Sequence, residues 1–129
     1  MCIRDRSKAE VGSRGEMLAR VYLEDAGYHI LETNWRFSRA EIDIIAKNGE
    51  MLVFVEVKTR SYNHFGEPSD AVGPKKEALI MDAAQRYMES VGHEWEIRFD
   101  IISIILRRSG DCEKLEHFED AFFLSLIHI

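Results

Sequence analysis

The sequence EIDIIAKNGEMLVFVEVKTR, residues 41–60, contains two mainly apolar segments joined by Asn48-Gly49. Apolar and polar residues alternate in both segments, which predicts β-strands at residues 41–46 and 51–59. Asn-Gly between two such segments is a strong signal for a β-hairpin with a type I′ turn. If Asn48 and Gly49 are the two central turn residues, Lys47 pairs with Glu50 and the rest of the register follows.

In this register the two faces of the hairpin differ sharply. One face is apolar and pairs Ile44 with Val53, Ile42 with Val55, and Val57 with Ala40. The other face pairs Asp43 with Phe54, Glu41 with Glu56, and Lys58 with Arg39. Like charges directly across a strand pair repel by about 3 kcal/mol at ~5 Å and an effective dielectric of ~20. We therefore expect a cation among these carboxylates, either Lys58 or a divalent metal.

The flanking segments complete an α/β pattern. Residues 12–28 predict a helix that stops at Gly27, and residues 29–37 predict a strand. Pro74 suits the first turn of a second helix, whose apolar stripe is Leu79, Ile80, Ala83, Ala84, Tyr87 and Met88. Residues 96–106 predict a buried strand, and residues 117–122 close the domain. The order αβββαβ predicts a single α/β domain with a central mixed sheet flanked by helices.

Length and composition bound the class of protein. A chain of 129 residues with 46% hydrophobic and 31% charged residues is typical of one soluble globular domain. It has no apolar run of the ~18 residues that a membrane span needs and no secretory signal, so we expect a cytoplasmic protein without a membrane partner. Cys2 and Cys112 have no metal-binding spacing. The histidines at 29, 93 and 117 also lack ligand spacing and are expected on the surface or in strands.

The two ends of the chain suggest an origin outside the natural protein. MCIRDR, residues 1–6, can be encoded by ATG TGT ATA AGA GAC AGR, and LSLIHI, residues 124–129, by CTG TCT CTT ATA CAC ATC. The two coding sequences are reverse complements over their shared length and resemble a transposon-end adaptor used for sequencing libraries. We interpret residues 1–6 and 124–129 as translated adaptor and residues 7–123 as the natural domain. The alternative is an unstructured tail and an apolar terminal strand.

Charge limits the ways in which this chain can bind nucleic acid. The net charge of −6 counts against a strong general DNA binder, because such binding depends on neutralising phosphates with a basic surface. A local basic patch remains compatible with it, and the candidates are Arg39, Arg60, Lys75 and Lys76. The two lysines begin a helix, where backbone donors favour phosphate; a solvated helix end is the alternative. Residues 61–73 either close over nucleic acid or form a plain connection.

Asp43, Glu56 and Lys58 together are suited to metal-assisted hydrolysis of a phosphodiester. Two carboxylates can hold Mg²⁺, which polarises a phosphoryl oxygen and lowers the pKa of a bound water, while a lysine orients that water or stabilises developing charge. Taken alone, Glu56-Val-Lys58 equally describes an ion pair on a solvated sheet. The carboxylate on the neighbouring strand favours the metal site.

Several segments resemble one known family. They are GSRGEMLARVYLEDAGYHILETNWR (12–36), AEIDIIA (40–46), LVFVEVKTR (52–60), FGEPSDAV (65–72), RFDII (98–102) and HFEDAF (117–122). In this order they resemble the YraN family, bacterial proteins similar to Holliday junction resolvases. That family is similar to the PD-(D/E)xK, restriction-endonuclease-like superfamily. The resemblance covers nearly the whole natural domain and implies that fold.

The resemblance also implies roles for individual residues. Asp43 and Glu56 would be the metal carboxylates, with Mg²⁺ or Mn²⁺ as cofactor, and Lys58 the catalytic lysine. Glu16 matches an additional acidic position that many such nucleases bring to the metal, or it is a first-turn carboxylate favoured by the helix dipole. Glu41 belongs to the family pattern and contacts either the metal or a basic neighbour.

These observations predict a metal-dependent nuclease that acts on DNA, extended to branched DNA by analogy with the resolvases. Ala40 stands where the family has glycine, so we expect a local backbone adjustment with the site retained. Because such enzymes cut symmetric substrates as homodimers, a homodimer is a candidate assembly. The alternative function is a non-catalytic nucleic-acid-binding or protein-interaction module on a nuclease scaffold, which the acidic net charge favours.

Overall fold

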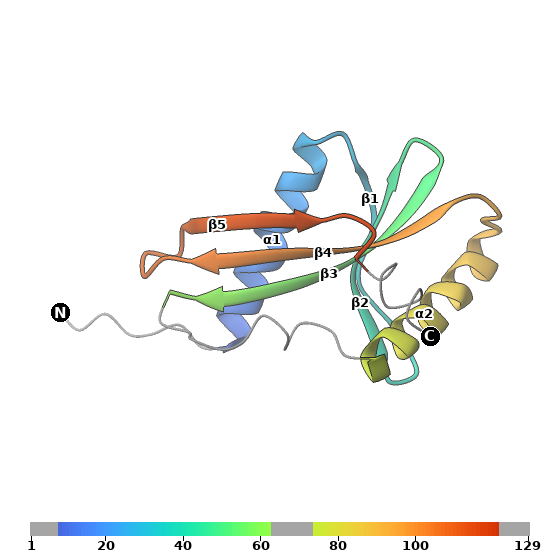
Figure 1. The fold of residues 1–129 in the computed structure, drawn as a ribbon, viewed down its shortest axis with the longest axis horizontal. Helices are drawn as coiled ribbons and strands as arrows, with labels where there is room; N and C mark the ends of the chain where they lie inside the picture. The colour runs from blue at the N-terminus through green and yellow to red at the C-terminus, as the bar shows by residue number, and fades with distance from the viewer. Residues whose placement is uncertain (1–7, 63–73, 122–129) are drawn as a thin grey trace.

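A computed structural model describes residues 8–62 and 74–121 (Figure 1). Its elements are α1 Lys8–Asp25, β1 His29–Phe37, β2 Ala40–Asn48, β3 Met51–Ser61, α2 Pro74–Val91, β4 Ile97–Leu106 and β5 Cys112–Phe118. The predictions for both chain ends and for most of the loop at 61–73 lie outside the described residues. None of the described helices is long and apolar enough to cross a membrane.

The five strands form one mixed sheet in the order β1-β2-β3-β4-β5. Strands β3 and β4 are parallel, and the other neighbours are antiparallel. The parallel pair requires a crossover connection, which α2 provides. The protein is therefore a single α/β domain, and its arrangement is consistent with the predicted nuclease-like fold.

The two helices cover opposite faces of the sheet. Figure 1 shows α1 behind β3, β4 and β5, and α2 beside β2. One core lies under α2 and includes Ile42, Ile45, Leu52, Phe54, Ile80, Ala83, Ala84, Tyr87 and Phe99. The other lies under α1 and includes Ala19, Leu23, Ile44, Ala46, Val53, Val55, Ile102, Ile104 and Leu106. Strands β3 and β4 are apolar on both faces because both faces are covered.

Two elements differ from the sequence-based expectation. Helix α1 begins at Lys8, four residues before the expected start, and ends at Asp25. Gly27, the predicted stop, follows two residues later, and its φ of 95° allows the Tyr28 N–H to donate to the Leu23 carbonyl. Strand β5 is absent from the predicted elements. Its sequence CEKLEHF is half charged and pairs only with β4, so an edge position explains why it lacks a strong strand pattern.

The β2–β3 turn corrects the predicted hairpin register. Asn48 pairs with Met51, so the central turn residues are Gly49 and Glu50 instead of Asn48 and Gly49. Gly49 has a φ of 63° and Glu50 is not among the described residues with positive φ, as in a type II′ turn, which places glycine first. The register shifts by two residues, so Ile44 pairs with Val55 and not with Val53.

The predicted assignment of residues to the two faces also needs correction. A shift of two preserves alternation, yet Ile42 packs in the core under α2 while Ile44 packs under α1. Alternation along β2 is therefore interrupted at Asp43, where pairing with β3 ends. The face expected to gather charges is covered by α2, and Glu56 is only 8% exposed.

Helix α1 approaches β3 closely at one glycine. A Cβ added to Gly15 would lie 1.7 Å from Oγ1 of Thr59, so the helix backbone packs against the Thr59 side chain at a distance that only glycine allows. The neighbours of this contact are Glu16 on the helix and Lys58 on the strand. Gly15 thus brings a candidate metal carboxylate close to the strand that carries Glu56 and Lys58.

Candidate functional site

The candidate site lies where β2 separates from β3. The two strands are paired from Asn48 and Met51 as far as Ile44 and Val55. The next residues along this register are Asp43 and Glu56, which the corrected register places across from each other. The sequence-based register instead places Phe54 opposite Asp43 and Glu41 opposite Glu56. Extended by one residue past the last pair, the actual register puts the two principal carboxylates nearer to facing positions than the predicted one does.

Where β2 separates from β3, the Asp43 side chain accepts a hydrogen bond that a backbone carbonyl of a paired strand would otherwise accept. Its Oδ2 accepts a hydrogen bond of 2.8 Å from the Val57 N–H. Burial raises the pKa of Asp43 to about 7, and the charge of Glu56 adds to the effect. Glu16 and Glu41 raise it further, while the Val57 N–H opposes the shift. The Val57 N–H therefore offsets only part of the unfavourable environment of the Asp43 charge.

Glu56 has a cationic partner from the second helix. Lys76 Nζ lies 2.5 Å from Glu56 Oε1, and the Glu56 side chain is only 9% exposed, against 52% for Lys76. The sequence predicts a cation among the carboxylates and offers Lys58 or a metal for that place. Lys76, which was expected to contact nucleic acid, contacts Glu56 in the described conformation.

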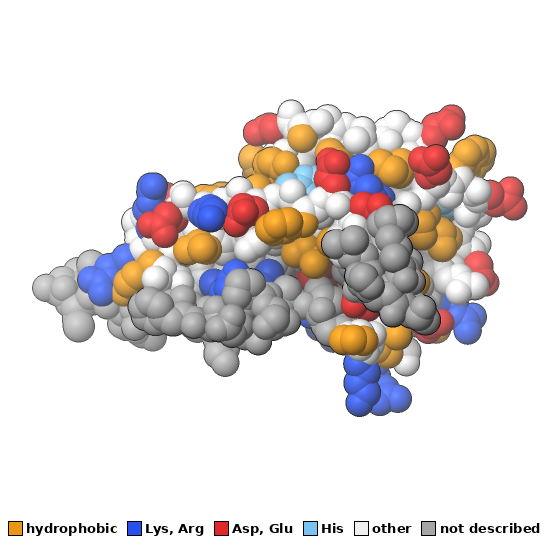
Figure 2. All heavy atoms as spheres, viewed as in Figure 1, with side chains coloured by type: hydrophobic (Ala, Val, Ile, Leu, Met, Phe, Trp, Pro, Cys, Tyr) orange, Lys and Arg blue, Asp and Glu red, His pale blue; other side chains and the backbone are white. Residues whose placement is uncertain are grey.

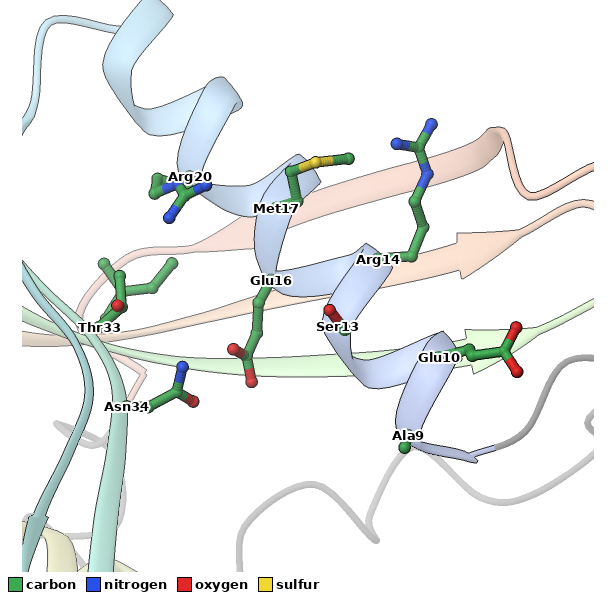
Figure 3. A pocket seen from close by; sticks show the side chains of 10 residues that line it. Ala9, Glu10, Ser13, Arg14, Glu16, Met17, Arg20, Thr33 and Asn34 are labelled. Atoms are coloured by element: carbon green, nitrogen blue, oxygen red, sulfur yellow. The ribbon is translucent and has the colours of Figure 1, made fainter.

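Glu16 reaches the site from α1. Figure 3 shows its carboxylate extending toward Asn34 of β1, and the Asn34 side chain hydrogen-bonds to it. Burial raises the pKa of Glu16, Asn34 lowers it, and the charges of Glu41 and Glu56 raise it. Both residues line a cavity of about 640 Å³ between α1 and β1, whose wall also includes Arg14, Arg20 and Thr33.

Asn34 is a site residue that the sequence pattern does not single out. Its flanking residues Thr33 and Trp35 pair with Ile44 and Ile42, so the register places Asn34 across from Asp43. Asn34 has a φ of 52°, a left-handed conformation that asparagine tolerates better than most residues. Asparagine is unusual inside a strand, and this was the only signal in the sequence. The connection of Asn34 with the candidate site appears only from the pairing of β1 with β2.

The fourth carboxylate also has a protein partner. Glu41 forms an ion pair of 2.9 Å with Arg36, so the basic neighbour that the sequence allowed for Glu41 is present. Glu16, Glu41, Asp43 and Glu56 thus each contact a different protein group. Within residues 8–62 and 74–121, no three histidine, cysteine, aspartate or glutamate side chains are arranged to hold a metal ion.

The chemistry of these donors nevertheless suits a hard divalent cation. Carboxylate oxygens are the ligands that Mg²⁺ and Mn²⁺ prefer. The raised pKa of Asp43, with three carboxylates among its causes, indicates excess negative charge that a cation would neutralise. The ligand atoms and the negative charge of these residues therefore suit such an ion. To bind it, the carboxylates would have to give up their present hydrogen bonds and ion pairs with protein groups.

The remaining predicted residues occupy different elements. Lys58 is half-buried on β3, two residues beyond Glu56, and pairs with Ser103 of β4. Arg60 is half-buried on the same strand, whereas Arg39 is exposed in the β1–β2 turn and Lys75 is exposed on α2. On the face shown in Figure 2, described Lys and Arg side chains are interspersed with Asp and Glu. That face offers no continuous basic surface among its described residues.

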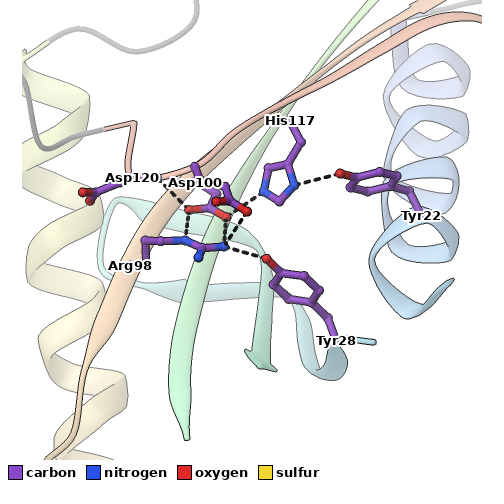
Figure 4. A network of polar contacts seen from close by, with 7 residues as sticks. Tyr22, Tyr28, Arg98, Asp100, His117 and Asp120 are labelled. Atoms are coloured by element: carbon purple, nitrogen blue, oxygen red, sulfur yellow. Dashed lines mark hydrogen bonds and ion pairs between the residues drawn. The ribbon is translucent and has the colours of Figure 1, made fainter. Parts of the chain in front are cut away.

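A second polar cluster is centred on Asp100 of β4 (Figure 4). The buried Asp100 accepts from Arg98 at 2.8 Å and contacts His117 Nε2 at 2.7 Å. His117 Nδ1 meets the Tyr22 hydroxyl at 3.0 Å, and Arg98 donates to the Tyr28 hydroxyl at 2.6 Å. The cluster connects β4 and β5 with α1 and the start of β1.

His117 is more deeply placed than its sequence context indicates. The expectation was a surface or strand position; it lies on β5, but its side chain is 7% exposed and belongs to this network. Burial would raise the pKa of Asp100, but hydrogen bonds from His117, Arg98 and the Asp120 N–H hold it below the ordinary value. Hydrogen bonding to Asp100 raises the pKa of Arg98.

Comparison with known proteins identifies the family. The profile described as "Uncharacterised protein family UPF0102" matches residues 15–104. The chain belongs to the UPF0102 family. A UPF0102 protein of Christiangramia forsetii is 48% identical over 114 residues, which cover 88% of this chain and 94% of that protein. A UPF0102 protein of Chlorobium chlorochromatii is 43% identical over 122 residues, covering 92% and 95%.

Membership in UPF0102 confirms the resemblance to the YraN family. The matched residues contain the separation of β2 from β3, all four carboxylates, Lys58 and Lys76. A UPF0102 protein of Flavobacterium psychrophilum, 50% identical over 114 residues, also extends over 88% of this chain. The candidate site therefore lies wholly within the part of the chain that defines the family.

Proposed function

We propose that this UPF0102 protein is a metal-dependent nuclease that hydrolyses phosphodiester bonds in DNA. The observation that carries the proposal is the accumulation of negative charge around Asp43, where burial and the charges of Glu16, Glu41 and Glu56 raise its pKa to about 7. Perturbed carboxylates gathered from different elements are characteristic of functional sites. Branched DNA is the substrate class that the likeness to resolvases favours.

Each residue has a role that follows from its position. Asp43 and Glu56 would hold the ion, and Glu16 and Glu41 would supply further oxygens or negative potential. A bound Mg²⁺ or Mn²⁺ would supply Lewis acidity toward the phosphate and a more acidic water. Lys58, two residues from Glu56 on β3, would orient the attacking water or stabilise charge on the phosphoryl oxygens.

Nucleic acid would be held by cations around the site. Arg39, Arg60, Lys75 and Lys76 are the candidates for phosphate contacts, and each such contact would make affinity salt-dependent. A homodimer would suit a symmetric branched substrate. A cytoplasmic location would give the protein access to DNA.

Cleavage assays on the full chain test the proposal. Linear, flapped and four-way DNA are incubated with Mg²⁺, Mn²⁺ or EDTA, using wild type, Asp43→Asn and Lys58→Ala. We expect cation-dependent cleavage of at least one substrate by wild type and a loss of about 100-fold or more in both variants. Equal cleavage by wild type and both variants, or no cleavage by any of them, contradicts the nuclease proposal.

The second candidate is a non-catalytic binding module on the same scaffold. Two observations favour it: each of the four carboxylates has a protein partner in the described conformation, and the net charge is −6. Mn²⁺ binding that Asp43→Asn abolishes, together with unchanged DNA after long incubation, would support this candidate. Titration calorimetry alongside the cleavage assay measures both properties on the same protein.

A further inference from the structure

The contact between Lys76 and Glu56 joins two residues with different expected roles. Their side chains meet at 2.5 Å, although one was expected to bind metal and the other phosphate. Lys76 lies in the first turn of α2, where the helix dipole disfavours a cation. Glu56 is nearly buried, so its charge is poorly hydrated and needs a positive partner. The ion pair therefore compensates two unfavourable charges at once.

We propose that Lys76 has two alternative partners: Glu56 in the free protein, and a phosphate of the nucleic acid in the complex. In the free protein its ammonium neutralises Glu56. When Glu56 coordinates a divalent ion, Lys76 is released and turns to a phosphate of the nucleic acid near the N-terminus of α2. This inference rests on the proposed function, because it requires a metal ion at Glu56.

The exposure of the two partners makes such an exchange possible. The Lys76 side chain is 52% exposed and can reorient about its flexible stem without disrupting the core. Glu56 is fixed on the central strand β3 and cannot follow it. Backbone N–H groups at the start of a helix favour anions, so the released ammonium and the first turn of α2 would attract the same phosphate.

If Lys76 exchanges partners in this way, Lys76→Ala should strengthen metal binding and weaken DNA binding. In Lys76→Ala, Mn²⁺ should bind the nucleic-acid-free protein more tightly by about tenfold, or roughly 1.4 kcal/mol, because the internal competitor is gone. With Ca²⁺ present, the same variant should bind four-way DNA more weakly, and its salt dependence should fall by about one phosphate contact. A residue with a purely structural role would not strengthen one interaction while weakening the other.

Titration calorimetry with Mn²⁺ and fluorescence anisotropy with labelled four-way DNA measure the two effects on the full chain. Lys75→Ala is the matched control for metal binding, since it removes an exposed lysine from the same turn, and we expect its Mn²⁺ affinity to stay within about twofold of wild type. Lys76→Arg keeps the charge and should bind Mn²⁺ like wild type. Circular dichroism verifies that each variant is folded.

The outcomes separate this inference from the proposed function. Mn²⁺ binding by wild type with equal or weaker binding by Lys76→Ala overturns the exchange and leaves the metal site standing. Equal DNA affinity of wild type and Lys76→Ala in Ca²⁺ overturns the phosphate contact. If neither wild type nor Lys76→Ala binds Mn²⁺, the metal site and the exchange both fail.

Discussion

Asp43 has a structural task at the point where β2 separates from β3, and we propose a functional one as well. Its Oδ2 replaces a carbonyl as acceptor for the Val57 N–H, where β2 and β3 separate. Its charge is disfavoured by burial and by three carboxylates. Active sites commonly retain such unfavourable charges because catalysis requires them.

Replacing Asp43 by asparagine should stabilise the protein at neutral and alkaline pH. Because the pKa of Asp43 is raised, its protonated form stabilises the folded state. This contribution is fully present below pH 3.8, the ordinary pKa of aspartate, and is lost as the pH rises through about 7. The amide of the introduced side chain cannot ionise, yet its carbonyl can still accept from the Val57 N–H. We expect Asp43→Asn to be more stable than wild type at pH 8, by at most about 4 kcal/mol, and similarly stable near pH 4.

Thermal unfolding followed by circular dichroism at the two pH values measures this difference. Glu41→Gln is the control, because Glu41 is partly exposed and paired with Arg36, so its removal should change stability by less than about 1 kcal/mol. A stability gain for Asp43→Asn that is the same at both pH values would contradict the electrostatic explanation.

Helices and strands are held in place by two contacts of different kinds. Gly15 of α1 lies against the side chain of Thr59 of β3, at a distance that leaves no room for a Cβ. The Asp100 network links β4 and β5 with α1 through buried hydrogen bonds. Both contacts orient α1, which carries Glu16 toward the separation of β2 and β3.

Two glycines of the same helix should respond oppositely to alanine. Gly12→Ala meets nothing within 4 Å and should be neutral or stabilise the helix by up to about 1 kcal/mol. Gly15→Ala would place its Cβ 1.7 Å from Thr59 Oγ1, so the helix must shift, and we expect a loss of about 2 kcal/mol or more.

Urea denaturation of both variants measures this contrast. Thr59→Gly should restore part of the stability lost in Gly15→Ala, because the clashing atoms are removed. If Gly15→Ala is as stable as Gly12→Ala, the close approach of α1 to β3 is incorrect.

Removing the charge of Asp100 should destabilise the protein strongly at neutral pH. Asp100→Asn removes the nearer anionic partner of the half-buried Arg98 and leaves it the 3.6 Å ion pair with the exposed Glu119, so we expect a cost of about 3 kcal/mol. The lowered pKa of Asp100 means that its stabilisation is present above the ordinary value of 3.8 and lost as the pH falls through the lower folded value. The difference from wild type should therefore shrink in strong acid.

Glu116→Gln provides the comparison within the same sheet. Glu116 is on β5 and pairs with Lys114, but both side chains are largely exposed, so we expect a change below about 0.5 kcal/mol. Urea denaturation at pH 7 compares the two variants. Equal stabilities would show that the Asp100 network contributes no more than a surface ion pair.

For the protein in its entirety, we expect the net charge to make any binding of nucleic acid depend on divalent ions. The net charge is −6, and described basic and acidic side chains are interspersed on the face in Figure 2. We expect weak DNA binding in EDTA and an affinity at least about tenfold higher in Ca²⁺, which occupies carboxylate sites. The double variant Asp43→Asn, Glu56→Gln should bind DNA more tightly than wild type in EDTA, because it removes two charges at the site.

Fluorescence anisotropy with labelled four-way DNA measures these affinities at one fixed salt concentration. The control Glu89→Gln, Glu94→Gln removes the same charge from two exposed positions, Glu89 in the last turn of α2 and Glu94 just after the helix. Its affinity in EDTA should change less than that of the site variant. Equal gains in the two double variants would indicate a general charge effect and no local site.

The local sequence pattern was sufficient for most of the fold. Period-two alternation in residues 41–60 predicted β2 and β3, and helical spacing predicted α1 and α2, because both periods follow from backbone geometry. It also predicted a buried Tyr87, which is 4% exposed. Leu79 departs from the predicted stripe and is 40% exposed, since a period does not specify the width of the covered face. The edge strand β5 carries too few apolar residues to show a pattern.

Part of the candidate site could likewise be predicted from the local sequence, and part depends on the tertiary structure. Asp43, Glu56 and Lys58 lie within one hairpin, so alternation and a short turn were enough to predict them as neighbours, although the turn lies one residue further along and the register is shifted by two. The partners Lys76 and Asn34 come from α2 and β1, and only the packing of those elements on the hairpin brings them to Glu56 and Glu16. Contacts between distant segments depend on strand register, sheet order and helix placement. These are set by burial of the whole core, so they produce no periodic pattern in the local sequence.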